Sequence, residues 1–415
     1  MFLKKYFKDH KPRPAGLEIL KYIGPGFLVT VGFIDPGNWA ANIACGSQFG
    51  YGLLWIVTLS TVMLILLQHN AAHLGIVSGL CLSEAATIHF SKPVSKGFLI
   101  SGILATIATA TAEILGAAIG LNMLFHIPLI IGSAICSIAV LAVVLSNSYK
   151  MIERYIIGFV SLIGLAFIYE LFLTDVQWGA AITGAFVPSI PKNSILIIMS
   201  VMGAVVMPHN IFLHSEIIQS RKFNQEGEGI IKKRLKFEFL DTIIAMVSGW
   251  VINCIIIIVV ASVFFSHNII VTELQQAEAT LRPLLGDAAA TVFAIALLFA
   301  GFSAAVTAAM ASGSIFSGMF GEPLDLKDNH SRVGVFITMI GAFIAICIIG
   351  DPFRGLILSQ VALSIQLPFT IFALIMLTSS KKVMGDHRNT LLTKTLLWCI
   401  AFVMIGFNLA LLFNI

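Results

Sequence analysis

The chain has 415 residues, of which 58% are hydrophobic and 11% are charged, and its formal net charge is +4 at pH 7. A soluble domain carries about 25% charged residues, so this composition excludes a soluble globular protein. It indicates a polytopic protein that is embedded in a lipid bilayer.

Eleven stretches have the length of about 20 apolar residues that a helix needs to cross a bilayer. In chain order they are 18–46, 52–76, 97–125, 127–147, 151–173, 193–220, 238–265, 288–318, 333–349, 355–379 and 391–413. The external loops 174–192 and 266–287 are long and mixed in composition, and we expect short surface helices in them. We therefore predict an all-α multi-pass membrane protein with one transmembrane domain, residues 1–415.

The distribution of lysine and arginine predicts the orientation. With the N-terminus inside, 22 of the 25 basic residues lie in cytoplasmic segments, and only Lys192, Arg282 and Arg354 fall outside. This asymmetry agrees with the positive-inside rule. The basic start of the chain, Met1 to Pro14, is not followed by a signal-peptide cleavage site. We expect a protein of the plasma (inner) membrane with its N-terminus in the cytoplasm and its C-terminus outside.

The first span is interrupted by the quartet Asp35-Pro36-Gly37-Asn38. Proline removes a backbone donor, glycine lets the chain leave the helix, and a carboxylate within the bilayer is costly unless it faces a cavity or a ligand. We interpret this as a helix that unwinds in the membrane, with Asp35 and Asn38 directed at a cation. The alternative is that Asp35 is a capped or paired structural carboxylate.

The sixth span repeats the pattern with Met207-Pro208-His209-Asn210. Paired interruptions in corresponding halves of a chain point to the binding site of a transporter with inverted repeats. We therefore predict a first repeat over 18–173 and a second over 193–379, with the span 391–413 outside both. The charged loop 221–237 joins the two halves.

The residue types at the two breaks favour a transition metal. Asp35 supplies negative charge, Asn38 a neutral oxygen, and Gly32 and Ala204, each three residues before a break, can offer backbone carbonyls. The thioether of Met207 is a soft ligand, whereas calcium and magnesium prefer hard oxygen ligands. The alternative for Met207 is a methionine that merely fills the core.

Other polar residues in the spans are candidates for proton transfer or for a further ligand. Glu113 lies in the middle of the third span, and a histidine such as His209 is a residue type that can titrate near neutral pH, so both are candidates for a proton relay. For His214, a relay and a simple hydrogen-bonding role remain open. Gln360 can lend an amide oxygen to the ion or bond to another helix.

Several features argue against a catalytic or second metal site. His69 and His73 have i, i+4 spacing but lie at a span end, where polar residues are common. The six cysteines lie far apart without a CxxC pair, which indicates reduced thiols. No Walker A, HExxH, GxSxG or kinase signature occurs, so we expect no enzyme and no cofactor. We also expect no nucleic-acid partner and no obligate protein partner.

Five stretches together resemble the Nramp family of divalent metal transporters over nearly the whole chain. They are Gly24-Pro25-Gly26-Phe27-Leu28, Asp35-Pro36-Gly37-Asn38-Trp39-Ala40, the run from Gly46 to Tyr51, the run from Met207 to Ser215 and the run from Ser359 to Pro368. The resemblance implies a LeuT-like fold and proton-coupled uptake of manganese or iron. It also implies that Asp35, Asn38 and Met207 are metal ligands, with carbonyls from Gly32 and Ala204. In the same way, Glu113 and His209 match proton-linked positions and Asn408 a polar residue of the last span.

The chain departs from the family pattern at positions that bear on proton coupling. Ala110 stands where family members usually carry aspartate, and Asn42 where many do. Only Lys327 and Arg332 represent the arginine cluster near the ninth span. Met207 is retained, which argues against the magnesium-type branch. The remaining alternatives are a cation-coupled amino-acid symporter of the same fold and a membrane metalloenzyme or sensor.

Overall fold

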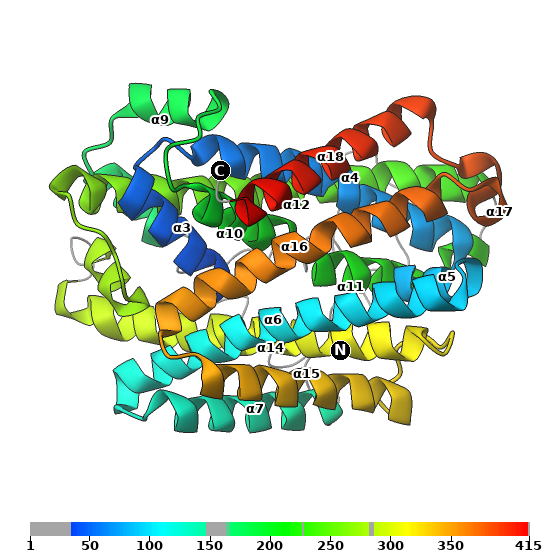
Figure 1. Ribbon diagram of the computed structural model, residues 1–415, viewed down its shortest axis with the longest axis horizontal. Coiled ribbons are helices and arrows are strands. Elements are labelled where there is room, and N and C mark those ends of the chain that lie inside the picture. The colour runs from blue at the N-terminus through cyan, green and yellow to red at the C-terminus, as the bar shows by residue number, and fades with distance from the viewer. Residues whose placement is uncertain (1–34, 147–163, 165, 226–227, 282–285, 414–415) are drawn as a thin grey trace, which may run out of the picture.

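The structure is a computed structural model that describes residues 35–146, 164, 166–225, 228–281 and 286–413. Every regular element in these ranges is a helix, which confirms the predicted all-α class. Eight helices of the described part are long and apolar enough to cross a membrane. In Figure 1 the long helices run along the longest axis of the molecule, with α9 at one end of the bundle and α5 and α17 at the other.

The long helices follow the predicted spans closely. They are α4 (Leu54–Ser78), α6 (Lys92–Phe125), α12 (Glu228–Val263), α14 (Ala289–Gly318), α15 (Asn329–Ile348), α16 (Pro352–Thr378) and α18 (Leu391–Leu412). The largest difference is that α6 and α12 begin at residues 92 and 228 rather than 97 and 238. Their first turns are polar, and an apolar-length criterion does not detect a helix that continues beyond the bilayer. The span predicted at 127–147 forms the 17-residue helix α7 (Leu129–Leu145).

The sixth span is broken at Met207, as predicted. Helix α10 (Ile195–Val206) ends there and α11 (Pro208–Gln219) begins at the next residue. Met207 itself has φ 37° and ψ 90°, a left-handed conformation that few residues other than glycine adopt. Pro208 is favourable at the first position of α11, where an unbonded N–H would otherwise stand.

The first span has a corresponding boundary at Asp35. This residue is extended, with φ −114° and ψ 158°, and α3 (Pro36–Phe49) begins immediately after it. Pro36 occupies the first helical position, as Pro208 does in α11. The part of the predicted span that precedes Asp35 lies outside the described residues, and so does most of the fifth span, 151–173.

Small residues let the helices around the breaks pack closely. A Cβ atom at Gly120 of α6 would lie only 2.6 Å from the carbonyl oxygen of Ala294 in α14. Close backbone approach of this kind is typical of membrane helices, where van der Waals packing replaces the hydrophobic drive between helices. Helix α10 contacts α3, α4, α16 and α18 and is buried from residue 197 to 206. The break at Met207 therefore lies in the middle of the bundle.

The shorter elements lie in the connections. The predicted surface helices are present as α9 (Trp178–Phe186), η4 (Phe265–His267) and η5 (Leu274–Thr280). The remaining ones are α5 (Leu82–His89), η3 (Phe223–Gln225), η6 (Gly286–Ala288), α17 (Lys381–Met384) and η7 (Gly385–His387). All six cysteines are free, in agreement with the predicted absence of a disulfide framework.

Candidate metal-ion site at the two helix breaks

Asp35 is the N-cap of α3, at the position predicted for the break in the first span. Its Oδ1 atom accepts a hydrogen bond of 2.6 Å from the backbone N–H of Asn38, and the residue is 2% exposed. In the part of the chain that the structure describes, no lysine or arginine forms an ion pair with this carboxyl group. A buried carboxylate without a positive partner carries a large desolvation cost, which a bound cation offsets.

Asn38 is held by two other buried asparagines. Its Nδ2 donates to Oδ1 of Asn253 on α12 at 2.8 Å, and its Oδ1 accepts from Nδ2 of Asn42 at 3.1 Å. Asn42 also donates to Oδ1 of Asn253 at 2.7 Å. Sequence reasoning missed the role of Asn253, although an asparagine within the apolar run 251–261 was a detectable signal.

Met207 lies at the second break with its sulfur inside the protein. The residue is 3% exposed, and Nδ2 of Asn210 lies 3.2 Å from its Sδ atom. The carbonyl of Ala204 lacks its usual helical donor, because the residue four positions later is Pro208, which has no N–H. A thioether and a backbone carbonyl are therefore available at the same turn. Gly32, which was expected to offer the equivalent carbonyl at the first break, lies outside the described residues.

Gln360 of α16 lies between the two breaks. A Cβ atom at Gly37 of α3 would collide with its side-chain amide, and one at Gly203 of α10 would collide with its backbone carbonyl. Two glycines that are 166 positions apart thus pack against one residue. The Oε1 atom of Gln360 is buried and has no hydrogen-bond partner among the described residues. This oxygen is the type of ligand that the sequence predicted from this position.

Glu113 lies on α6 and His209 at the start of α11, next to Met207 and Pro208. A Cβ atom at Gly116 of α6 would collide with Pro36, so the part of α6 that carries Glu113 packs against the start of α3. Nδ1 of His209 lies 3.0 Å from Oγ1 of Thr109, which is one turn before Glu113 on α6. Oε2 of Glu113 is buried without a partner in the described part of the chain. Two of the three predicted proton-linked residues, Glu113 on α6 and His209 on α11, are therefore buried close to the breaks.

Other polar residues singled out from the sequence lie elsewhere. Nδ1 of His214 lies 2.6 Å from Oε1 of Gln68 on α4, so this histidine joins α11 to α4. His69 pairs with Glu238 of α12 at 2.7 Å and stacks on His73. Within the described ranges the two histidines belong to no group of three candidate metal ligands. Nδ2 of Asn408 donates to the carbonyl of Ser364 at 3.3 Å.

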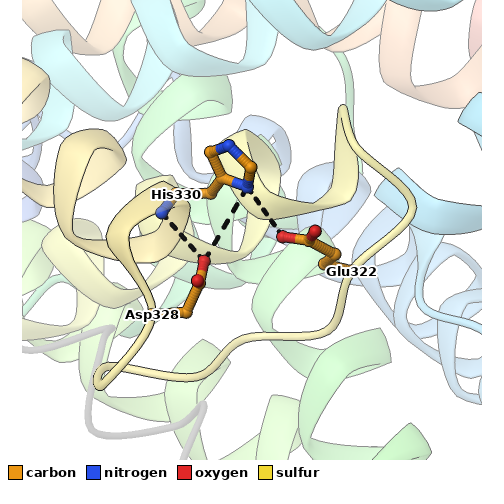
Figure 2. Close-up of side chains that lie close together, drawn as sticks. All are labelled: Glu322, Asp328 and His330. Atoms are coloured by element: carbon orange, nitrogen blue, oxygen red, sulfur yellow. Dashed lines mark hydrogen bonds and ion pairs between the residues drawn. The ribbon is translucent and has the colours of Figure 1, made fainter.

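A second group of possible ligands lies away from the breaks, near the start of α15. Figure 2 shows Nδ1 of His330 directed at the carboxylates of Glu322 and Asp328, at 2.8 and 3.8 Å. The ring of His330 stacks on Phe320, and Asp328 caps α15. Sequence analysis did not identify this group. We interpret this group as structural, because its ion pairs and the cap connect the preceding loop to the start of α15 at the surface.

Three cavities that described residues line also lie away from the breaks. One of about 790 Å³ opens at the end of the bundle that carries α9, and its lining includes Tyr51, Asp175 and Ser262. None of the residues proposed above as ligands lines it. The breaks themselves are tightly packed, as the collisions at Gly37 and Gly203 indicate.

Comparisons with known proteins all find similarity to one family of membrane proteins. Residues 26–414 match the family model Nramp, described as natural resistance-associated macrophage protein-like. The chain is 40% identical over 398 residues to a divalent metal cation transporter MntH from Caldanaerobacter subterraneus, with 94% of this chain and 93% of that protein covered. It is 36% identical over 397 residues to MntH of Bacillus subtilis, with 95% and 92% covered.

Solved structures agree in the fold. The crystal structure of a manganese transporter from Eremococcus coleocola is 30% identical, has a TM-score of 0.77, and is covered to 88% by 97% of this chain. Mhp1, a nucleobase-cation-symport-1 family transporter, is 17% identical with a TM-score of 0.61, and the match covers 95% of this chain and 91% of Mhp1. This second likeness concerns the fold alone. The architecture is the predicted LeuT-like fold.

Proposed function

This chain belongs to the Nramp family of membrane transporters for divalent metal cations, and from that premise we propose that it imports Mn²⁺ or Fe²⁺. Co²⁺ and Cd²⁺ are further substrates of the same chemical class. The observation that carries the proposal is Asp35, a buried carboxylate at a helix boundary that has no ion-pair partner among the described residues. The relatives that are named as divalent metal cation or manganese transporters support it.

The proposed ligands combine hard and soft atoms. Asp35 supplies the charge, and Asn38, Gln360 and the carbonyl of Ala204 supply neutral oxygens. Gly32 adds a carbonyl in our proposal by analogy with Ala204. The sulfur of Met207 favours transition metals over calcium and magnesium, because calcium and magnesium prefer oxygen ligands. Its presence argues against a magnesium-type transporter.

An amino-acid symporter is the alternative that the shared fold allows. Such a protein binds the carboxylate of its substrate at the ends of its broken helices. Here the carboxylate of Asp35 occupies the N-cap position of α3, where it would repel another anion. A metal cation therefore suits the site better.

We propose transport by alternating access, in which α3, α10 and α11 move against the rest of the bundle. In the orientation expected from the basic residues, α3 and α10 lie on the external side of the site. Their contact with Gln360 then closes the external path, and the ion leaves on the side of α11. This scheme rests on the predicted repeats 18–173 and 193–379, with α18 outside both, in a plasma (inner) membrane with a cytoplasmic N-terminus and an external C-terminus.

We propose that metal transport by this chain is only loosely coupled to protons. Glu113 and His209 provide two groups that can exchange protons beside the site. Farther along α6, the polar contact with α15 consists of hydroxyl groups, with Oγ1 of Thr106 lying 3.0 Å from Oγ1 of Thr338. Hydroxyl groups do not change charge near neutral pH. Ala110 lies on α6 between Thr106 and Glu113 and has no group that could carry a proton. His214 is hydrogen-bonded to Gln68 of α4.

Uptake of Mn²⁺ into proteoliposomes tests the site directly. Asp35→Asn keeps the shape of the side chain but removes its charge, so we expect uptake to be abolished. Asp287→Asn changes an exposed aspartate in η6 and serves as the matched control. Near-normal uptake by Asp35→Asn would place the ion elsewhere. An amino-acid panel in the same vesicles separates a metal transporter from an amino-acid symporter.

A further inference from the structure

Asn210 makes an unusual contact with the predicted sulfur ligand. Its Nδ2 atom donates a hydrogen bond to Sδ of Met207 at 3.2 Å, and its backbone N–H donates to the carbonyl of Met207 at 3.0 Å. Both residues are buried: the exposed fraction is 3% for Met207 and 7% for Asn210. The side chain and the backbone of Asn210 therefore hold Met207 at the same time.

The side chain of a methionine needs such a contact if it is to present its sulfur in one direction. Three rotatable bonds separate Sδ from the backbone, and the thioether adapts readily to different surroundings. The left-handed backbone of Met207 fixes where the side chain begins but not where the sulfur lies. A thioether sulfur has two lone pairs, so one can accept the amide hydrogen while the other faces an ion.

The corresponding asparagine at the first break is held differently. Asn38 follows Asp35 by three residues, as Asn210 follows Met207, but its amide group bonds across to Asn253 of α12. Asn210 instead turns its amide back onto the residue that opens its own break. Equivalent positions in the two quartets thus serve different purposes, and only the second contacts a soft ligand.

We propose that Asn210 is a positioning residue that orients the thioether of Met207 and thereby sets the preference for soft metal ions. The inference rests on the proposed function, because it requires that Met207 contacts the transported ion. A soft ion such as Cd²⁺ depends most on sulfur, so loss of the amide donor weakens its binding more than that of Mn²⁺. Ions that bind through oxygen alone are affected least.

The test is a double-mutant cycle measured by uptake of Cd²⁺ and Mn²⁺ into proteoliposomes. Asn210→Leu keeps the approximate shape and removes the donor, and Asn210→Ser is a second variant whose side chain is too short to reach the sulfur. We expect the KM for Cd²⁺ to rise about tenfold and that for Mn²⁺ to rise less, with kcat unchanged; tenfold corresponds to about 1.4 kcal/mol, the size of one hydrogen bond. Asn122→Leu, which removes a side-chain bond to Ile127 at the end of α6, is the control.

The second arm of the cycle separates positioning from a general structural role. In a Met207→Ala background, adding Asn210→Leu should leave the ratio of the two KM values unchanged, because no sulfur remains to be oriented. An equal effect on both metals, or the same selective effect without Met207, overturns the inference. If Met207→Ala alone leaves the discrimination between Cd²⁺ and Mg²⁺ intact, the ligand set of the proposed function is wrong instead.

Discussion

Replacing Gly203 by alanine tests whether α16 must close against α10 during transport. A Cβ atom at this position would collide with the carbonyl oxygen of Gln360 and would lie 2.9 Å from its carbonyl carbon and 3.0 Å from the backbone nitrogen of Ser364. These are backbone atoms, which cannot turn aside as a flexible side chain can. The two helices must therefore separate for the methyl group to be accommodated.

The cost can be estimated from the behaviour of tightly packed cores. Inserting a methyl group into such a core costs about 1–3 kcal/mol. If the externally closed arrangement bears this cost and the open one does not, the closed population falls about 5–150-fold. We expect the turnover rate of Mn²⁺ uptake to fall within this range, since each cycle must pass through the closed arrangement.

Two measurements check this reasoning. Initial rates of Mn²⁺ uptake into proteoliposomes report the turnover, and alkylation by a membrane-impermeant thiol reagent reports the external path. For the second, a cysteine replaces Ala204 in a chain without its native cysteines, and Gly203→Ala should speed its modification. Gly97→Ala in α6 is the matched control, because no atom lies within 4 Å of the Cβ position there. Uptake by Gly203→Ala within twofold of the parent would refute the proposed closure.

Three further predictions concern selectivity, proton movement and the support of Asn38. Met207→Ala should retain Mn²⁺ uptake but admit competition by Ca²⁺ and Mg²⁺; unchanged competition in vesicles would show that sulfur is not the filter. Parallel traces from a pH dye and a metal dye should show a weak proton signal that is not proportional to metal flux, and a strong, fixed ratio would contradict loose coupling. Asn253→Leu removes the two hydrogen bonds that its Oδ1 accepts from Asn38 and Asn42. We expect the KM for Mn²⁺ to rise about 5–150-fold, which corresponds to a cost of about 1–3 kcal/mol. An unaltered KM in this variant would mean that Asn38 needs no support from α12.

The positions of the helix boundaries at Pro36 and Pro208, and the atoms available there, could be predicted from the sequence. Pro36 and Pro208 remove backbone donors regardless of what surrounds them, so each interruption could be predicted locally. The same is true of the apolar lengths that predicted α4, α14 and α16, because the thickness of the bilayer sets them. The limits of α6 and α12 were less exact, since a helix can continue past the bilayer in polar residues.

The residues that support those atoms could be identified only from the packing of the helices. Asn253 reaches Asn38 across 215 positions, and Thr109 reaches His209 across 100. Gln360 meets both breaks because glycines at 37 and 203 allow α16 to approach. His214, five residues after His209, turns to α4 instead. Backbone restrictions act within one or two turns and can be read from neighbouring residues, whereas such contacts depend on how whole helices pack.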